Sequence, residues 1–343
     1  MIPVSVKQRL ALVLATVLLG GCNQASRLAA FELTGATMGT RFSVTLVAPP
    51  DDLEKDALQA DIETLLASIE QRTSTYLDQS EISTFNASAS TDWIKVSREL
   101  CEIVADSLAI SRRVGGAFDV TAGPLVNLWG FGPDDLRAEP PSDEDIATAR
   151  ERVGYRKLHT DCSRPVLRKD HPDLYVDLSA YAKGYAVDRI ADLLRDRGVA
   201  NFLVEIGGEL RMQGHNASTN SWTIAVENPL ADGGTVHSVL QLTDAAVATS
   251  GDYHNYFDYA GQRYSHVIDT RLGGPVSHPL ASVTVVSEST AFADAMATAL
   301  FAMGPEEGFE FARRDGLAVF FLVRSGAGVN ERMTREFESL QHP

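Results

Sequence analysis

The chain has 343 residues, of which 44% are hydrophobic and 22% are charged, and its formal net charge is −16. These values are typical of globular proteins and exclude a collagen-like, coiled-coil or wholly disordered chain. The acidic balance argues against a general nucleic-acid binder, which needs a basic face for phosphates, and three cysteines are too few for a disulfide scaffold.

The first 21 residues predict a cleaved export signal. Lys7 and Arg9 lie just before an apolar run over Leu10–Leu19. This run is too short to cross a bilayer, since a spanning helix takes about 20 apolar residues. Residues 19–22 read Leu-Gly-Gly-Cys and resemble a bacterial lipobox. We therefore expect a signal peptide over 1–21, a lipid-modified Cys22 with a linker over 22–33, and a folded domain over 34–343. We expect the protein on the periplasmic side of the cell membrane, anchored in the inner membrane.

The two remaining cysteines leave an alternative open. Cys101 shares an apolar helical stripe with Leu100, Val104 and Leu108, which predicts a buried free thiol. An oxidising compartment would also permit a disulfide between Cys101 and Cys162.

The first half of the chain predicts one strand and three helices. The strand covers 42–47, where polar and apolar residues alternate. The first helix is capped by Asp51 or Asp52, the second opens at Ser97 and runs to Val114, and the third opens at Ser142 and ends at Gly154. The acidic, proline-rich segment 133–141 predicts an exposed loop.

The second half is richer in strands. A helix is predicted over 183–197, a second over 291–303 ending at Gly304-Pro305, and a last helix after it. The predicted strands are 202–206, 222–226, 236–242, 246–250, 263–268, 282–287 and 318–323. Because helices and strands mix without regular βαβ alternation, the sequence predicts an α+β fold of two mixed lobes with a cleft between them.

Several familiar catalytic motifs are absent from the sequence. Residues 130–133 read Gly-Phe-Gly-Pro, which lacks the third glycine of a dinucleotide fingerprint. The sequence contains no phosphate-binding Gly-Lys-Ser/Thr loop, no His-x-x-x-His pair among its eight histidines and no Gly-x-Ser-x-Gly elbow.

Short polar segments, most of them with glycine, stand out instead. Each alone is explained by a helix end, a hairpin turn or a cap. They are Thr37–Thr40, Ser74–Asn86, Gly115–Leu125, Asp177–Tyr185, Glu205–Glu209, Tyr264–Asp269 and the pair Asp294 and Thr298.

Together these segments indicate a bound phosphate ester. Glycine-rich turns and helix N-termini let backbone N–H groups approach an anion. Asp294 and Thr298 lie four residues apart and share a helical face, and their hard oxygens suit Mg²⁺. Lys183 supplies a positive charge. Aromatic platforms for a flat ring are Tyr76, Phe118 and Tyr181.

In this order, from about Thr34 to Val323, the segments resemble the ApbE family of flavin transferases. The likeness rests on Thr-Met-Gly-Thr at 37, Gly-Gly-Ala-Phe-Asp-Val-Thr at 115, Ala-Lys-Gly-Tyr-Ala-Val-Asp at 182, Glu-Ile-Gly-Gly-Glu at 205 and Ser-His-Val-Ile-Asp at 265. The resemblance implies a Mg²⁺-dependent transfer of FMN from FAD, through a phosphoester, to a threonine or serine of a target protein, with release of AMP. It also implies that the target is a subunit of a membrane redox complex.

The resemblance further implies roles for individual residues. The FAD site is expected to include Met38, Tyr76, Ala117, Phe118, Asp119, Asp177, Lys183 and Ile268. The magnesium ligands are expected to be Asp294, Thr298 and the backbone carbonyl of Ala180. His266 and Asp269 are expected near the reacting phosphate, where histidine is suited to accept the hydroxyl proton near neutral pH.

Two positions depart from the family pattern. Ala180-Tyr181 stands where glycine and an aliphatic residue are common, so Tyr181 is expected to narrow the ring pocket, and Asp269-Thr270 stands where Asp-Pro is common. Two other functions use the same residues: an FAD pyrophosphatase with water as acceptor, and a non-catalytic flavin-binding lipoprotein. An aromatic residue at the Tyr76 position accompanies transferases in the family and favours transfer.

Overall fold

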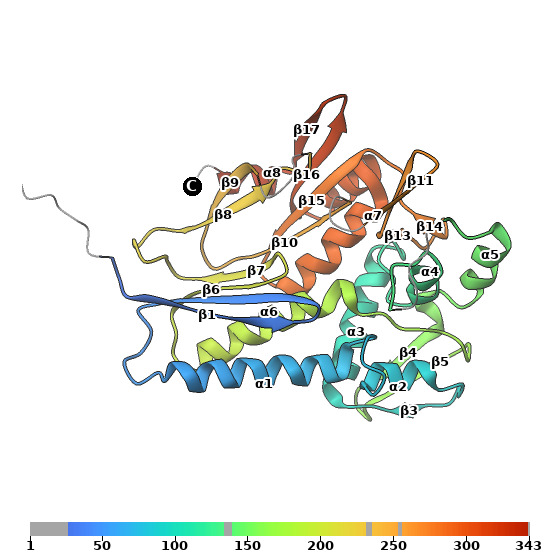
Figure 1. The fold of residues 1–343 in the computed structure, drawn as a ribbon, viewed down its shortest axis with the longest axis horizontal. Helices are drawn as coiled ribbons and strands as arrows, with labels where there is room; N and C mark the ends of the chain where they lie inside the picture. The colour runs from blue at the N-terminus through green and yellow to red at the C-terminus, as the bar shows by residue number, and fades with distance from the viewer. Residues whose placement is uncertain (1–26, 134–138, 231–234, 253–255, 342–343) are drawn as a thin grey trace, which may run out of the picture.

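A computed structural model describes residues 27–133, 139–230, 235–252 and 256–341. Its centre is one antiparallel sheet, in the strand order β1-β2-β6-β7-β10-β15-β16-β17 (Figure 1). These strands are β1 (Ala30–Thr37), β2 (Thr40–Val47), β6 (Asn201–Ile206), β7 (Glu209–Gln213), β10 (Ala246–Gly251), β15 (Leu280–Ser287), β16 (Ala318–Ser325) and β17 (Gly328–Met333).

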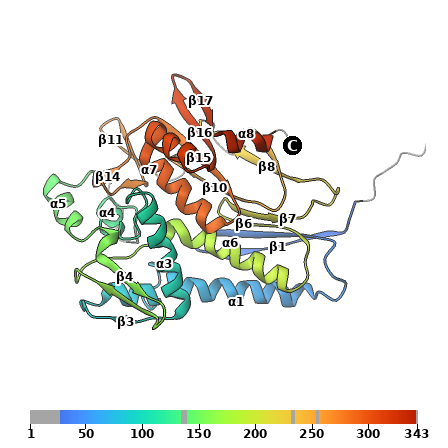
Figure 2. The ribbon, with the colours of Figure 1, turned by 180° about the vertical axis from the view of Figure 1, so that it is seen from behind.

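Both faces of the sheet are covered. Three long helices, α1 (Lys55–Thr73), α6 (Ser179–Asp196) and α7 (Thr290–Arg314), pack on one face (Figure 2). The β8 (Trp222–Glu227) and β9 (Val236–Leu242) ribbon and the helix α8 (Arg335–Gln341) cover the other. Burial of apolar surface on both sides is what holds a sheet of this size.

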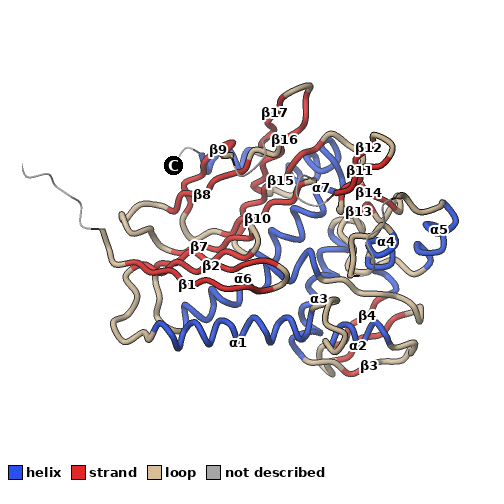
Figure 3. The backbone as a smooth tube through the Cα atoms, viewed as in Figure 1, coloured by secondary structure: helices blue, strands red, loops and turns tan. Residues whose placement is uncertain are grey.

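A second lobe is built of short elements around a three-stranded sheet (Figure 3). Its strands are β3 (Ile94–Lys95), β4 (Leu158–Asp161) and β5 (Val166–Lys169). Its helices are α2 (Glu81–Ala87), α3 (Arg98–Arg113), α4 (Gly123–Leu128), α5 (Asp143–Glu151) and the 3₁₀ turn Tyr155–Lys157. Two small hairpins lie near α4 and α7, formed by β11 (Tyr256–Tyr259) with β12 (Gln262–Ser265) and by β13 (Ile268–Asp269) with β14 (Gly274–Pro275). The predicted α+β class is confirmed.

Most predicted elements occur, and several of their ends follow the predicted chemistry. Ser97 caps α3 by accepting the Leu100 N–H at 3.1 Å, and Ser142 caps α5 by accepting the Asp145 N–H at 3.2 Å. By contrast, α1 begins at Lys55 after Glu54, so the predicted aspartate caps of the first helix are wrong.

Other boundaries differ for identifiable reasons. α6 begins four residues before the predicted start, because a distorted turn at Ala180 (φ −91°, ψ 20°) precedes its regular part. The predicted helix end at Gly304 is a bend, with Gly304 at φ 81°, and the helix resumes at Pro305. The predicted strand 263–268 divides into β12 and β13. Strands β1, β7 and β17 were not predicted.

The predicted signal segment, Cys22 and most of the linker lie outside the described residues, as does the centre of the proline-rich loop. Within the described part of the chain, no helix combines the length and the apolar character that crossing a bilayer requires.

The expectation of a free thiol at Cys101 is wrong. Cys101 on α3 is fully buried and forms a disulfide with Cys162, with the Cα atoms 5.7 Å apart. The apolar stripe of α3 packs against the small sheet, and the turn that follows β4 carries Cys162 to the same place. The bond therefore ties α3 to the β4–β5 hairpin.

We predict that this disulfide stabilises the second lobe. It closes a loop across a sequence separation of 61 residues, for which loop-closure entropy corresponds to about 4 kcal/mol of unfolding free energy. A Cys101→Ala/Cys162→Ala variant should unfold at lower urea concentration than the wild type, and reductant should destabilise the wild type only. Peptide mapping without reductant should recover the two cysteines in one cross-linked fragment. Wild-type protein whose unfolding is indifferent to reductant would contradict the pairing.

Candidate active site

Two adjoining pockets lie where the lobes meet. The first, here called the Lys183 pocket, has a volume of about 560 Å³, and the second, the His266 pocket, about 270 Å³. Tyr76 and Ser179 line both. Volumes of this size are in the range of small-molecule sites, and the shared walls make the two pockets suitable for the two halves of one extended ligand.

The β1–β2 hairpin supplies one wall of the Lys183 pocket. Its two turn residues, Met38 and Gly39, both have positive φ, 48° and 72°, as a tight primed turn requires. Glu70 on α1 accepts hydrogen bonds from the Thr37 hydroxyl at 2.6 Å and the Met38 N–H at 2.8 Å. Glu70 therefore fixes the turn that presents Met38, a role that sequence analysis did not find.

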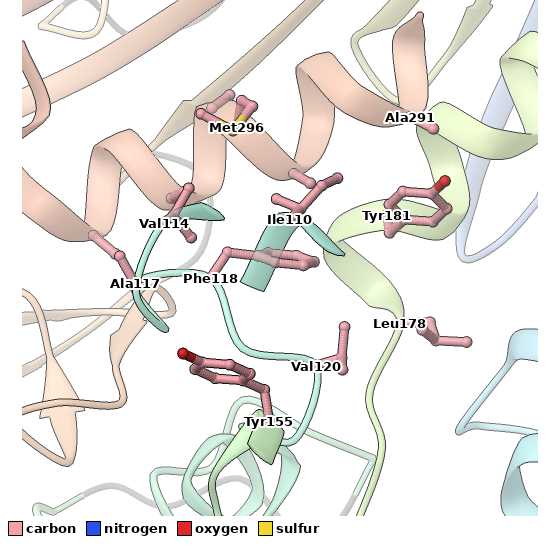
Figure 4. Close-up of a cluster of buried hydrophobic side chains, with 14 of the residues drawn as sticks. Ile110, Val114, Ala117, Phe118, Val120, Tyr155, Leu178, Tyr181, Ala291 and Met296 are labelled. Atoms are coloured by element: carbon pink, nitrogen blue, oxygen red, sulfur yellow. The ribbon is translucent and has the colours of Figure 1, made fainter. Parts of the chain in front are cut away.

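The end of α3 supplies the wall of the His266 pocket. Gly115 and Gly116, at φ 62° and 90°, turn the chain so that Ala117 and Phe118 line the pocket. Figure 4 shows the Phe118 ring in the middle of the buried cluster. The wall is thus continuous with the core and cannot move independently of it.

Asp119 lines the same pocket, but its carboxylate is engaged in the protein. One oxygen accepts from the Thr121 N–H at 2.8 Å and hydroxyl at 2.7 Å, and the other from the Tyr155 N–H at 2.8 Å. Burial raises the pKa of Asp119, and these hydrogen bonds oppose the rise. Asp119 therefore fastens the pocket wall to the Tyr155 turn.

Asp177 and Tyr76 both line the His266 pocket. Tyr76 is 64% exposed, so its ring is available to a ligand. Asp177 accepts from the Ser179 N–H at 2.9 Å and hydroxyl at 2.6 Å. The preceding residue, Val176, exchanges two hydrogen bonds with the Asn86 side chain, at 2.9 and 2.8 Å. Asn86 thus holds the loop that presents Asp177.

A charge cluster adjoins the Lys183 pocket, in which Lys183 lines the pocket and the two carboxylates, Glu209 and Asp294, are buried beside it. The Lys183 ammonium lies 3.4 Å from Glu209 Oε1 and 3.8 Å from Asp294 Oδ2. Burial works against the charged ammonium, yet the carboxylates of Asp294 and Glu209 raise the pKa of Lys183 above its usual range. Lys183 is therefore charged at all physiological pH values.

Glu209 was not predicted to have a role. It begins β7, directly after the Gly207-Gly208 turn, where both residues have positive φ, 58° and 100°. Burial raises the pKa of Glu209, although Lys183 opposes this, and within the described chain Glu209 Oε2 has no hydrogen-bond partner. A Cβ on Gly207 would lie 3.0 Å from the Thr40 Cγ2 atom, a contact so tight that Thr40 would have to shift.

The structure brings the expected magnesium ligands to one region. Asp294 and Thr298 are one turn apart on α7, and Thr298 and Ala180 line the His266 pocket. In a regular helix the Gly184 N–H would donate to the Ala180 carbonyl. Here the Gly184 N–H donates to Asp294 Oδ2 at 3.1 Å. Ala180 itself departs from helical geometry, so its carbonyl does not have the orientation of a regular helical carbonyl.

The chemistry of these donors fits Mg²⁺. A carboxylate, a hydroxyl and a carbonyl are hard oxygen ligands, and Mg²⁺ fills its remaining positions with water and substrate phosphate. Over residues 27–341, wherever the chain is described, no group of three His, Cys, Asp or Glu side chains is arranged to hold a metal. Burial raises the pKa of Asp294, opposed by Lys183.

His266 lies in its pocket at the end of a column of rings. It meets Phe131 edge-on, with centroids 6.4 Å apart. Phe131 stacks on Phe257, Phe257 on Tyr264 and Tyr264 on Trp129, at 5.6, 5.0 and 5.7 Å. The column links the imidazole to the β11–β12 hairpin.

Two sequence-based expectations are not matched by the geometry. Asp269 lines neither pocket, whereas its neighbours Ile268 and Thr270 line the His266 pocket. The buried Asp269 carboxylate pairs with the Arg271 guanidinium at 3.0 Å and accepts the Arg271 N–H, which stabilises the turn. Tyr181, expected to narrow the ring pocket, is 5% exposed and lies in the buried cluster (Figure 4). Its ring stacks on Tyr185, with the centroids 6.3 Å apart. It lies away from both pockets because it follows the distorted turn at Ala180, on the face of α6 that the core covers.

Comparison with known proteins agrees with this geometry. The family model described as ApbE family matches residues 38–321. A protein of Vibrio cholerae serotype O1 named FAD:protein FMN transferase is 39% identical over 322 residues, covering 94% of this chain and 95% of its own length. A protein of the same name from Escherichia coli strain K12 is 38% identical, covering 96% of each chain.

Solved structures show the same relationship. The flavin transferase ApbE from Vibrio cholerae superposes with a TM-score of 0.85 at 37% identity, covering 91% of this chain and 99% of its own. The apo form of the flavinyl transferase ApbE from Pseudomonas stutzeri gives 0.85 at 38% identity, covering 92% and 98%. The pockets, the charge cluster and these similarities together place the chain in the ApbE family.

Proposed function

We propose that this protein is an FAD:protein FMN transferase, which moves FMN from FAD to a threonine or serine hydroxyl of a target protein and releases AMP. The observation that carries the proposal is that Lys183, 3.8 Å from Asp294, lines one of two adjoining pockets, while Thr298, one turn after Asp294 on α7, lines the other. Relatives that bear this activity in their names, at similar length, support it.

FAD is proposed to occupy both pockets. Met38, Tyr76 and Lys183 would contact it in the Lys183 pocket, and the remaining contacts would come from the His266 pocket, namely Ala117, Phe118, Asp119, Asp177 and Ile268. Lys183, charged and held by two carboxylates, would attract the pyrophosphate.

Mg²⁺ is proposed to bind Asp294, Thr298 and the Ala180 carbonyl, where it would neutralise negative charge on the pyrophosphate and on the departing AMP. The chain's own contribution is to hold these oxygens on α6 and α7 in fixed positions.

The transfer itself makes one bond and breaks one. The acceptor oxygen bonds to the FMN phosphorus, the bond from that phosphorus to the bridging oxygen breaks, and AMP leaves with that oxygen. His266 is proposed to take the hydroxyl proton, since it lines the pocket and its side chain type titrates near neutrality. Asp269 is proposed to act indirectly, by fixing the turn that follows His266.

We further propose that the protein is exported and anchored by lipid at Cys22 on the periplasmic side of the membrane, with a redox-complex subunit as acceptor. The Leu-Gly-Gly-Cys sequence at 19–22 after an apolar run supports the anchor. The Cys101–Cys162 disulfide supports export, because such bonds persist in oxidising compartments.

We predict that Asp294→Ala lowers transfer by roughly 100-fold or more, because it removes a carboxylate proposed to hold Mg²⁺. EDTA should abolish turnover of the wild type, and added Mg²⁺ should restore it. Calorimetric titration of Mg²⁺ into the FAD-loaded protein gives a readout that does not depend on turnover. Asp196→Ala, an exposed aspartate on the same helix as Lys183, is the control. If the Asp294→Ala variant keeps full activity without metal, the proposed metal site is wrong.

We predict that Cys22→Ala releases the protein from membranes, because the lipid is attached through this thiol. Fractionation of cells expressing the variant should move the protein from the membrane to the soluble fraction, whereas Asn23→Ala should stay with the membrane. If Cys22→Ala fractionates like the wild type, the anchor proposal is wrong.

We predict that incubation with FAD, Mg²⁺ and an acceptor protein increases the acceptor's mass by one FMN moiety, with one AMP released per label. Replacing the labelled threonine by valine should abolish the increase, because the attacking oxygen is lost. Slow FAD hydrolysis without acceptor is expected, since water can enter the open pocket. AMP and free FMN formed at one rate, with or without acceptor, would instead identify a pyrophosphatase.

A further inference from the structure

A third pocket, of about 330 Å³, lies behind the wall of the His266 pocket and is here called the basic pocket. Its four cationic side chains are Arg150, Arg156, Lys157 and Arg271. Asp119 and Thr270 line both the basic pocket and the His266 pocket, so the two cavities are separated by little more than these residues.

Such a concentration of positive charge is unusual in a chain whose net charge is −16. Arg271 is neutralised locally by Asp269 and Glu307, at 3.0 and 2.6 Å. None of the other three cations forms a salt bridge with a carboxylate of the described chain, although Lys157 lies close enough to Asp119 to favour its charged form. The Arg150 guanidinium donates to the Arg271 carbonyl at 2.9 Å. The pocket therefore carries a positive excess.

The remaining two cations are held by neutral groups. Lys157 Nζ donates to the carbonyls of Glu151 and Val153, at 2.6 and 2.9 Å. The Arg156 guanidinium lies over the Tyr155 ring, 4.9 Å from its centroid. A carbonyl or a ring orients a cation without cancelling its charge, so these side chains are placed to meet an anionic partner.

The basic pocket is rigid around these charges. A Cβ at Gly273 would lie 2.9 Å from both Arg150 Cδ and Ile146, so α5 packs directly against the turn after β13. The Tyr155 N–H binds Asp119, which fixes the opposite wall to the His266 pocket. Charges held in fixed positions bind with less loss of conformational entropy.

A phosphate group is not the ligand that this pocket fits. Its backbone donors are already used, because the N–H groups of Gly115, Gly116 and Gly154 bond to Arg112, Ser111 and Thr121. A phosphate cradle needs such N–H groups free and convergent. The positive charge of the pocket is carried by side chains, and those of Arg150 and Arg156 are exposed. Exposed cationic side chains can pair with the carboxylates of another protein.

We propose that the basic pocket binds an acidic segment of the acceptor protein, close in sequence to the hydroxyl that receives FMN; this rests on the proposed transferase function. The acceptor hydroxyl must enter the His266 pocket, and an extended chain advances ~3.3 Å per residue. Residues a few positions from the hydroxyl therefore reach the adjoining cavity. Leu272, which is 70% exposed and directly follows the pocket residue Arg271, adds an apolar contact at the edge of the pocket. Such complementarity sets partner choice and association rate.

The test is a charge reversal at the rim, Arg156→Glu. With the acceptor protein that gains FMN from the wild-type enzyme, the variant should show kcat/KM for the acceptor lowered about tenfold or more, mainly through KM. Its slow hydrolysis of FAD without acceptor should equal that of the wild type, which separates this inference from the proposed function. Arg150→Glu should act in the same direction. Lys95→Glu, an exposed lysine on β3 at the far end of the lobe, is the matched control.

A second measurement identifies the partner. Neutralising acidic residues beside the labelled hydroxyl of the acceptor should lower kcat/KM as Arg156→Glu does. When the neutralised acceptor is combined with the Arg156→Gln enzyme, the fold loss in kcat/KM should be smaller than the product of the two separate losses. Raised salt should weaken wild-type transfer more than that of the variant. Equal kcat/KM for Arg156→Glu and wild type would overturn the proposal, and so would a parallel loss of acceptor-free FAD hydrolysis, which would assign the pocket to FAD.

Discussion

The site depends on the close crossing of α6 and α7 at Gly184. A Cβ at this position would lie 2.4 Å from the Thr290 carbonyl oxygen, so only glycine lets the two helices approach so closely. The Gly184 N–H bonds to Asp294 across the contact at 3.1 Å. One turn later, Asp188 accepts the N–H groups of Thr290 and Ala291 at 2.9 and 3.0 Å, and so caps α7 from a neighbouring helix.

The contact between Lys183 and Asp294 follows from that crossing. Lys183 precedes the glycine on α6, and Asp294 lies on the first turns of α7, so the ammonium and the carboxylate meet only at this helix separation. The β6–β7 hairpin brings Glu209 to the same point. The attraction between the Lys183 ammonium and the two carboxylates offsets part of the desolvation free energy that burying Glu209 and Asp294 costs.

The sequence predicted well whatever depends on neighbouring residues. Ser97 and Ser142 lie directly before apolar periodic segments, and both are caps. Glu70 and Glu209 were missed because their partners are distant in sequence: Glu70 bonds to residues 32 and 33 positions away. The disulfide remained the less favoured alternative for the same reason, since helical periodicity shows that Cys101 is buried but not that Cys162 lies against it. Asp269 and Tyr181 were placed by resemblance, and the local turns direct both side chains elsewhere.

The column of rings from Trp129 to His266 has a consequence for the evolution of the site. Because each ring rests on the next, the imidazole takes its orientation from the fold of the β11–β12 hairpin. The hairpin's outer side chains, Tyr256 and Tyr259, are exposed. Substitutions that repack its ring-stacked residues, Phe257 and Tyr264, would therefore turn the His266 imidazole without changing any residue that lines the two pockets.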